Sequence, residues 1–223
     1  MEKKELIVRE NILGSNKKVA AEIRAELAGR GVLCVNLMSS PGAGKTSLLE
    51  RISEKLAAGH PMAVIEGDVE TERDAERIRA KGIPAWQIVT GGECHLEARM
   101  IGRLFGKLPD KLEFLFIENI GNLICPASFD LGEHLRCVLL STPEGDDKVK
   151  KYPEAFLTSD CLLITKSDLL PYLSFDPESV KREALELNPK LRIFVLSASR
   201  DWGLDDFIAF LIERRAELAS VHA

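Results

Sequence analysis

The chain has 223 residues, 45% of them hydrophobic, which is enough to bury one substantial core and predicts a single domain over residues 1–223. Its 30 Lys and Arg residues against 35 Asp and Glu residues give a formal net charge of −5 without a long basic run, which argues against nucleic-acid binding. Residues 1–6 have no apolar signal core, and no apolar run approaches the roughly 20 residues of a membrane helix. We therefore expect a cytoplasmic protein without membrane or nucleic-acid partners.

The first predicted element is a helix over residues 16–29. Val19, Ile23 and Leu27 repeat at intervals of four and form one apolar stripe, and glycines at 29 and 31 end the pattern. We expect this helix to pack on the edge of the main fold, within the same domain.

A glycine-bearing turn between a strand and a helix follows directly. The apolar run 32–38 predicts a buried strand, residues 39–46 read Ser-Ser-Pro-Gly-Ala-Gly-Lys-Thr, and a helical pattern begins at 45. This order is typical of a phosphate-binding loop, in which backbone N–H groups and the positive end of the helix face the phosphates. Glycine is usual where this chain has Ser39, and an ordinary glycine-rich turn is the alternative. We predict phosphate contacts from Gly42, Ala43, Gly44, Lys45, Thr46 and Ser47.

Short apolar runs alternate with helical patterns along the rest of the chain. Buried strands are predicted at 32–38, 62–65, 112–117, 136–140, 162–165 and 193–196, and helices near 45–57, 71–81, 95–106, 177–187 and 204–218. This alternation predicts a three-layer α/β fold, in which a mostly parallel sheet has helices on both faces and ligands bind at the carboxyl ends of the strands. Together with the phosphate loop, it indicates a P-loop NTPase fold.

The predicted catalytic residues come from this loop and from the ends of two later strands. Lys45 would bridge the β- and γ-phosphates, and the Thr46 hydroxyl would bind Mg²⁺. Asp68 would orient the attacking water or join the magnesium shell, with capping of the next helix as the alternative. Glu118 would bind Mg²⁺ directly or through water, and the N–H of Gly121 would sense the γ-phosphate, so we predict a switch there.

The sequence Thr-Lys-Ser-Asp follows a predicted strand where a guanine-binding motif is needed. The Asp168 carboxylate can accept hydrogen bonds from the guanine N1–H and exocyclic amine, which predicts selection of GTP over ATP. Asn usually begins such a motif; Thr165 keeps a hydroxyl but lacks the amide, and Lys166 comes next. A polar turn is the alternative interpretation. After the last strand, a backbone N–H in the small-residue loop at Ser197 and Ala198 would approach guanine O6.

A second set of residues predicts a transition-metal site. Cys94 and His95 are adjacent at the expected start of the helix near 95–106, and Cys125 follows the predicted switch. A helix N-terminus lowers a thiol pKa and favours the metal-binding thiolate. Two thiolates with one imidazole suit both nickel and zinc. Three ligands leave a tetrahedral site one short, and the fourth ligand stays open between water, Glu93 and a residue of a second subunit.

The two predicted sites are close in the sequence, since Cys125 follows Glu118 by seven residues. Loss of the γ-phosphate would therefore move a metal ligand, which leads to the hypothesis that hydrolysis gates metal release. Cysteines at 34, 137 and 161 lie in apolar strand patterns, and we interpret them as small buried hydrophobes.

Four segments together closely resemble the hydrogenase nickel-incorporation GTPases, the HypB family. They are the phosphate loop at 39–46, Gly-Gly-Glu-Cys-His-Leu-Glu-Ala at 91–98, Glu-Asn-Ile-Gly-Asn-Leu-Ile-Cys-Pro-Ala at 118–127 and Glu-Gly-Asp-Asp-Lys-Val-Lys-Lys-Tyr-Pro at 144–153. The resemblance runs from about Asn16 to the C-terminus. It implies a GTP-hydrolysing metallochaperone that assists nickel insertion into nickel–iron hydrogenase, with GTP, Mg²⁺ and either Ni²⁺ or Zn²⁺ as bound groups.

The resemblance also implies specific partners. It implies a GTP-promoted homodimer that binds metal between protomers through residues matching Cys94, His95 and Cys125. Lys148 matches a family lysine that reaches the nucleotide of the neighbouring protomer. A second nickel-delivery accessory protein and the hydrogenase large subunit are further expected partners. Residues 1–15 contain neither Cys nor His, so we expect no Cys- or His-rich nickel store within them.

Two other functions remain as alternatives. An accessory GTPase of this kind could serve urease or another nickel enzyme, although the Cys-His segment favours the hydrogenase branch. The second alternative is a metal-dependent dimerisation module with weak GTPase activity. Arg73 is a candidate for an arginine that assists hydrolysis, and we expect slow hydrolysis by the isolated protein.

Overall fold

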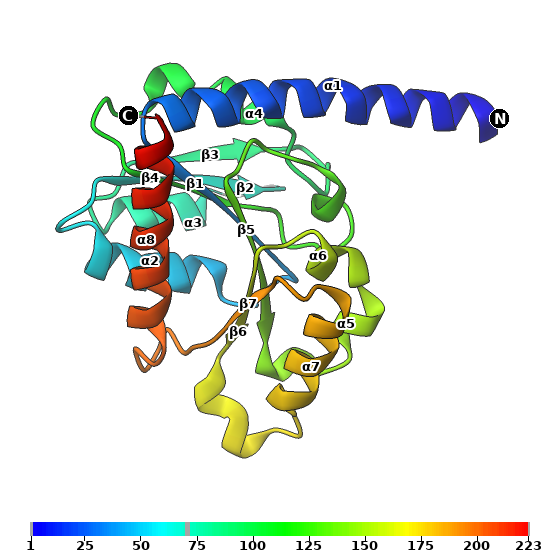
Figure 1. The fold of residues 1–223 in the computed structure, drawn as a ribbon, viewed down its shortest axis with the longest axis vertical. Coiled ribbons are helices and arrows are strands. Elements are labelled where there is room, and N and C mark those ends of the chain that lie inside the picture. Colours follow the sequence, from blue (N-terminus) through cyan, green and yellow to red (C-terminus); the bar gives the residue numbers. More distant parts are fainter. Residues whose placement is uncertain (1, 70–71, 223) are drawn as a thin grey trace.

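A parallel β-sheet forms the centre of the molecule (Figure 1). The structure is a computed structural model that describes residues 2–69 and 72–222, with side chains from 13 to 221 within these ranges. The described strands are β1 (Leu33–Ser39), β2 (Met62–Asp68), β3 (Ala85–Val89), β4 (Phe114–Glu118), β5 (Leu135–Ser141), β6 (Cys161–Thr165) and β7 (Arg192–Val195). They are ordered β3-β2-β4-β1-β5-β6-β7, with parallel neighbours, as predicted.

Helices connect the strands, because parallel neighbours need crossovers that return the chain to the same end of the sheet. The described α-helices are α1 (Glu2–Gly29), α2 (Lys45–Leu56), α3 (Arg73–Arg79), α4 (Ala98–Gly102), α5 (Lys148–Lys151), α6 (Pro153–Leu157), α7 (Pro177–Leu187) and α8 (Leu204–His222). The 3-10 helices are η1 (Phe105–Lys107), η2 (Pro126–Ser128), η3 (Thr142–Glu144) and η4 (Ser167–Tyr172). Within the described ranges, no helix combines the length and apolar character needed to cross a bilayer.

Alternating side chains along each strand give the sheet two apolar faces. In β1, Leu33, Val35 and Leu37 belong to the core that includes residues of α2, α3 and α8. Cys34 lies in the opposite core, together with residues of α1 and α4. Farther along that second face, residues of β5 and β6 pack with α6 and α7. Helices therefore cover both faces, which confirms the predicted three-layer α/β architecture.

The predicted strands are all present, with ends that differ by up to three residues. The helices expected near 45–57, 177–187 and 204–218 correspond to α2, α7 and α8. The helix expected near 95–106 is shorter, because it divides into α4 and η1. The helix expected near 71–81 is α3, which begins at Arg73; residue 71 lies outside the described residues.

Strand β3 is absent from the sequence-based prediction. It lies at the edge of the sheet, pairs with β2 alone, and its pattern is interrupted by Gln87. An edge strand packs against fewer neighbours, so its apolar pattern is weaker than that of a central strand. The consequence is functional: β3 ends at Val89, so the segment 91–95 leaves the same carboxyl edge of the sheet as the phosphate loop.

Helix α1 starts at Glu2, well before the predicted start at 16, and its N-terminal half extends beyond the sheet in Figure 1. Glu, Lys and Leu favour helix without requiring an apolar stripe, which explains the difference. The predicted stripe is the part that packs, since Ile23 and Leu27 are buried. A Cβ atom added to Gly132 would lie 2.3 Å from Ile23 Cγ2 and 2.8 Å from the Ala20 carbonyl oxygen. Helix α1 therefore sits in close contact with the loop around Gly132.

We predict that Gly132→Ala destabilises the protein more than Gly82→Ala. Both glycines have a positive φ, 85° and 77°, so both substitutions carry similar backbone strain. Only at position 132 does the new methyl group meet neighbours, since nothing lies within 4 Å of it at Gly82. Urea unfolding should show an additional loss of about 1–3 kcal/mol for Gly132→Ala. Equal losses for the two variants would contradict the close packing of α1 on this loop.

Candidate functional site

The phosphate loop has the geometry that its sequence predicts. Gly42 has φ 76° and Gly44 has φ 97°, a region that residues with a side chain rarely adopt. Helix α2 begins at Lys45, directly after Gly44, so its first N–H groups and its positive dipole end face the loop. The arrangement is suited to bind phosphate oxygens.

Lys45 and Thr46 converge on one buried carboxylate. Lys45 Nζ donates a hydrogen bond to Ser39 Oγ at 3.0 Å and lies 3.9 Å from Glu118 Oε1. Thr46 Oγ1 donates to the same Glu118 oxygen at 3.0 Å. The other oxygen, Glu118 Oε2, is buried without a hydrogen-bond partner among the described residues. An unpaired carboxylate oxygen beside a hydroxyl suits a hard divalent cation, so these residues fit a Mg²⁺ ion.

A second buried carboxylate, Glu66, is the register partner of Glu118 across β2 and β4. Burial raises the pKa of Glu66 to about 10, with a further contribution from the negative charge of Glu118. Burial also raises the pKa of Glu118, whereas the charge of Lys45 lowers it. Glu66 is thus the member of the pair that holds its proton more tightly, whereas Glu118 faces Lys45, whose positive charge favours the carboxylate.

A cleft of about 540 Å³ opens over the phosphate loop. Its lining brings together the predicted catalytic residues Lys45, Thr46, Asp68, Glu118 and Gly121. Asp68 is the last residue of β2. The N-cap position of α3 is occupied by Glu72, whose side chain makes no capping hydrogen bond.

Two further charged residues line this cleft and are absent from the sequence-based prediction. Asp74 and Arg77 lie three residues apart on α3, and the Arg77 guanidinium donates to Glu50 at 2.7 Å, to Asp74 at 3.2 Å and to Ser47 Oγ at 3.3 Å. Arg73, the predicted arginine, is exposed and is not part of the cleft lining. The available signal was the spacing of an Asp and an Arg on one helix face directly after a strand-end carboxylate.

The predicted guanine-binding motif contacts the phosphate loop directly. Thr165 Oγ1 donates to the Ala43 carbonyl oxygen at 2.8 Å, and Lys166 Nζ donates to the Gly42 carbonyl oxygen at 2.7 Å. Lys166 has φ 56°, and its own carbonyl oxygen accepts from Thr142 Oγ1 at 2.8 Å. The Thr165 hydroxyl therefore braces the phosphate loop in the position where the sequence lacks the usual amide.

Asp168 is oriented by the neighbouring small-residue loop. Ser197 Oγ donates to Asp168 Oδ1 at 2.5 Å and lies 3.0 Å from Ser199 Oγ. The hydrogen bond from Ser197 is the main cause that lowers the pKa of Asp168, so this carboxylate is ionised at neutral pH. Within this loop, the Ser197 N–H donates to the Trp202 carbonyl oxygen at 2.9 Å. The N–H of Ala198, the next residue in the loop, stays the predicted donor to guanine O6.

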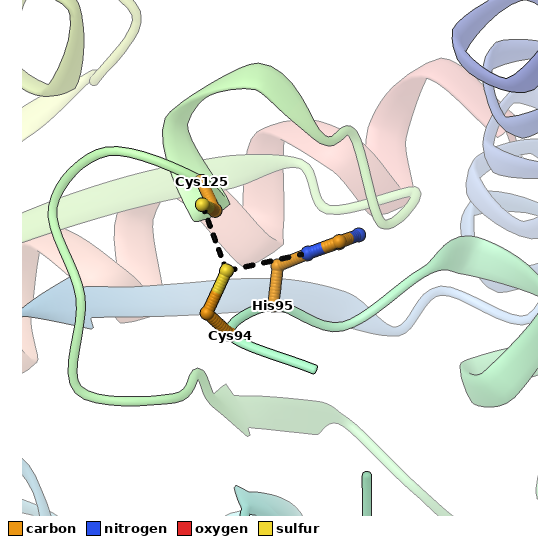
Figure 2. A group of neighbouring side chains, drawn as sticks. All are labelled: Cys94, His95 and Cys125. Atoms are coloured by element: carbon orange, nitrogen blue, oxygen red, sulfur yellow. Dashed lines mark hydrogen bonds between the residues drawn. The ribbon is translucent and has the colours of Figure 1, made fainter. Parts of the chain in front are cut away.

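Cys94, His95 and Cys125 come together as predicted (Figure 2). One potential ligand atom from each of them lies within 4.8 Å of the others. Cys94 Sγ donates to Cys125 Sγ at 2.8 Å and lies 3.9 Å from His95 Nδ1. Two sulfurs and an imidazole at these separations form a donor set that suits Ni²⁺ or Zn²⁺. Glu93, considered as a fourth ligand, is not part of this group.

The expected cause of thiolate formation at Cys94 is wrong. Helix α4 begins at Ala98, so Cys94 lies in the preceding loop and not at a helix N-terminus. The hydrogen bond with Cys125, together with burial, raises the pKa of the Cys94 thiol. Two adjacent thiols disfavour the loss of a proton in the absence of a cation. A bound metal ion reverses this balance, because its charge favours the thiolate.

An aromatic ring holds the imidazole of the group. His95 stacks on Phe129 with ring centroids 3.8 Å apart and planes inclined by 28°. His95 Nε2 is buried and has no hydrogen-bond partner among the described residues. Phe129 follows Cys125 by four residues and is a residue that the sequence-based prediction does not include.

The metal group and the cleft share one segment of chain, 118–125. A Cβ atom on Gly121 would lie 3.0 Å from Pro41 Cα, so this segment touches the phosphate loop. Asn122 Nδ2 donates to the Cys94 carbonyl oxygen at 3.4 Å, and Asn122 Oδ1 accepts from the Ile124 N–H at 2.9 Å. A displacement of Gly121 would therefore reach both cysteines.

Lys148 lies outside the cleft of its own chain. It is the first residue of α5, and its ammonium group lies 5.6 Å from the centroid of the Tyr152 ring. The cleft lining does not include it.

Comparison with known proteins agrees with this geometry. A family model described as "CobW/HypB/UreG, nucleotide-binding domain" matches residues 33–195. The "Hydrogenase maturation factor HypB" of Azotobacter vinelandii is 48% identical over 94% of this chain and 70% of the relative. The "Hydrogenase/urease maturation factor HypB" of Helicobacter pylori strain J99 is 43% identical over 97% of this chain and 91% of the relative.

A solved structure agrees as well. The crystal structure of HypB from Helicobacter pylori in complex with nickel superimposes with a TM-score of 0.87 at 43% sequence identity, covering 91% of this chain and 96% of the other. This chain thus resembles HypB proteins in sequence and in fold along most of its length. It also has the sheet order, the phosphate loop and the Cys-His-Cys group described above. The chain belongs to the HypB branch of the CobW/HypB/UreG family of nucleotide-binding proteins.

Proposed function

We propose that the protein is a GTP-hydrolysing metallochaperone that assists nickel insertion into nickel–iron hydrogenase. The observation that carries this proposal is the segment 118–125, which provides Glu118 and Gly121 to the nucleotide cleft and Cys125 to the metal group. A single P-loop GTPase domain with α1 packed on it holds both sites. One conformational change can therefore act on nucleotide and metal together.

The residues of the cleft have different roles in GTP hydrolysis. The loop N–H groups and Lys45 hold the β- and γ-phosphates, and Asp68 orients a water for attack on the γ-phosphorus. The bond from that phosphorus to the β–γ bridging oxygen breaks, which leaves GDP and inorganic phosphate. Thr46 and Glu118 would hold Mg²⁺, which when bound neutralises phosphate charge. Arg77 lies beside the loop but is paired with Glu50, which is in accord with slow hydrolysis by the isolated protein.

Guanine selection is assigned to the loops after β6 and β7. Asp168 presents an ionised carboxylate for the guanine N1–H and amine, and Ser197 fixes its orientation. Lys166 lies along the phosphate loop and would cover the base from that side. Ala198 would donate to guanine O6.

Nickel is the cargo of the Cys94, His95 and Cys125 group, and zinc fits the same donor set. The Helicobacter pylori HypB structure is a complex with nickel, which favours nickel as the delivered metal here. The group lies at the protein surface, with Cys94 exposed, so a second copy of the chain has access to it. We assign the missing ligand positions to a GTP-promoted homodimer, in which Lys148 of one protomer approaches the nucleotide of its partner.

The delivery route follows from this assignment. A second nickel-delivery accessory protein would exchange metal with the exposed thiols, and the hydrogenase large subunit would receive it in the cytoplasm. Service to urease is a related function, since the Helicobacter pylori relative is named as a maturation factor for both hydrogenase and urease. A dimerisation module with vestigial nucleotide chemistry is less well supported, because Lys45, Thr46, Asp68 and Glu118 all line the cleft.

Asp168→Asn should exchange the base preference of the protein. The amide can donate to the C2 carbonyl of xanthine, whereas it repels the guanine amine. We expect affinity for GTP to fall by roughly 100-fold or more, since two hydrogen bonds to a charged group are lost, and xanthosine triphosphate to be bound and hydrolysed instead. Calorimetric titration and phosphate release would measure both effects. Asp110→Asn, on an exposed loop, is the matched control; an unchanged GTP affinity in Asp168→Asn would refute the assignment.

Cys94→Ala and Cys125→Ala should each weaken Ni²⁺ and Zn²⁺ binding. Loss of a residue that only hydrogen-bonds to a metal ligand costs roughly 10- to 100-fold in metal affinity, and we expect a larger loss here. The reason is that each variant removes a metal-bonding sulfur. Competition against a chromophoric chelator measures the affinities. Cys34→Ala is the control, because Cys34 is a buried thiol in β1 away from this group, and it should bind metal normally. A Cys94/Cys125 double variant with undiminished metal capture would exclude the proposed site.

Metal affinity should differ between the GDP-bound and GTP-analogue-bound protein, and Gly121→Ala should reduce that difference. A methyl group at Gly121 would press on Pro41 and push the segment 118–125 away from the phosphate loop. The control is Gly59→Ala, because nothing lies within 4 Å of a Cβ at Gly59. Nickel titrations in both nucleotide states provide the measurement. Equal affinities of the wild-type protein in the two states would rule out gating by hydrolysis.

A further inference from the structure

The side chain of Asn16 connects two segments that are far apart in the sequence. It is 6% exposed, on the inner side of α1. Its Oδ1 accepts a hydrogen bond from the Ala98 N–H at 2.8 Å, and its Nδ2 donates to the Asp130 carbonyl oxygen at 2.6 Å. Ala98 follows His95 by three residues, and Asp130 follows Cys125 by five. One amide therefore joins the loop that carries Cys94 and His95 to the loop that begins at Cys125.

The stacked pair of His95 and Phe129 lies between these two anchoring points. Phe129 directly precedes Asp130, and its ring centroid is 3.8 Å from that of His95. These contacts form a closed ring. His95 stacks on Phe129, and the backbone leads from Phe129 to Asp130. The Asn16 amide then joins Asp130 to Ala98, and the backbone leads from Ala98 back to His95. A closed ring of contacts limits both the position and the plane of the imidazole.

Helix α1 is a fixed support for this amide, because other contacts hold it against the same loop. Arg24 Nε donates to the Glu133 carbonyl oxygen at 2.9 Å, and Arg24 also pairs with Asp130 at 2.5 Å. Gly132 packs against Ile23 without room for a side chain. Removal of the Asn16 amide would therefore remove one hydrogen-bonded link between the two ligand loops while α1 stays in place.

We propose that Asn16 is a positioning residue for the metal centre, which presets the distance between the two ligand loops and the orientation of the His95 ring before metal binds. This inference rests on the proposed role of Cys94, His95 and Cys125 as metal ligands. An amide is suited to the task because one short side chain offers both a donor and an acceptor. An aspartate at this position keeps the acceptor for Ala98 but sets a carboxylate oxygen against the Asp130 carbonyl.

The first test compares Asn16→Ala and Asn16→Asp with Asn188→Ala. Asn188 is a matched control, since its amide also joins segments, donating to the carbonyl oxygens of Phe156, Leu157 and Ser159. We expect Ni²⁺ and Zn²⁺ affinity to fall roughly 10- to 100-fold in both Asn16 variants, with GTP affinity unchanged. Asn188→Ala should bind metal as the wild type does. Metal affinity that is undiminished in folded Asn16 variants would overturn the proposal.

A second measurement separates positioning from a general loss of structure. In a His95→Ala background the imidazole is absent, so Asn16→Ala should cause a smaller loss of metal affinity than it does in the wild-type background. A loss of the same size in both backgrounds would show that Asn16 acts on the fold as a whole, and would overturn the proposal.

A third measurement needs no metal. In the metal-free protein, the ring current of Phe129 shifts the carbon-bound proton resonances of the His95 imidazole, and NMR of the Asn16→Ala variant should show this shift lost, with the shift kept in Asn188→Ala. An unchanged His95 resonance in Asn16→Ala would overturn the positioning role even if the wild-type protein bound no metal. Absence of metal binding by the wild type would instead overturn the proposed function, so the two failures are distinguishable.

Discussion

The parallel register of the sheet is the constraint on which both sites depend. Because neighbouring strands run in the same direction, the carboxyl ends of β1, β2, β3 and β4 meet at one edge, and the loops that follow them become neighbours. The phosphate loop follows β1, Asp68 ends β2, the Cys94 loop follows β3, and Glu118 ends β4. This one feature brings together residues from four separate parts of the chain that we propose to bind nucleotide and metal.

Buried charge makes the phosphate end of this edge responsive to its ligands. Lys45, Thr46 and Glu118 are all nearly inaccessible to solvent, and the neutral Glu66 lies behind them. Charges in such surroundings interact more strongly than at the surface, so the arrival or loss of a phosphate has a large local effect. Gly121 touches Pro41, and Asn122 contacts the Cys94 loop, which offers a physical route from the phosphates to the thiols. The energetic coupling itself is a hypothesis that this geometry motivates.

Sequence patterns predicted most of the fold and most of the candidate site. Long apolar runs and strand-end carboxylates are local features, and the central strands, the phosphate loop and the Cys-His-Cys group were predictable from them. Features that depend on a partner distant in the chain could not be predicted from local sequence. Strand β3 pairs on one side only, Arg77 approaches the phosphate loop by the packing of α3, and the Ser197 N–H is taken by the Trp202 carbonyl. The thiol pKa of Cys94 is set by Cys125 and not by a helix.

The sequence by itself determined which side chains are available for chemistry: glycines that permit the phosphate loop, a lysine and a threonine that we propose for phosphate and magnesium, an aspartate that we propose for guanine, and sulfur and nitrogen donors that we propose for a transition metal. These are properties of side chains and of short spacings. Only the tertiary structure decided how the cleft and the metal group are connected, through Gly121 against Pro41 and Asn122 against the Cys94 loop. It also decided how the metal group is held, by Phe129 on His95 and by Asn16 between the ligand loops. The physical reason is that packing and hydrogen bonds between distant segments arise from the folded sheet and leave no periodic signal in the chain.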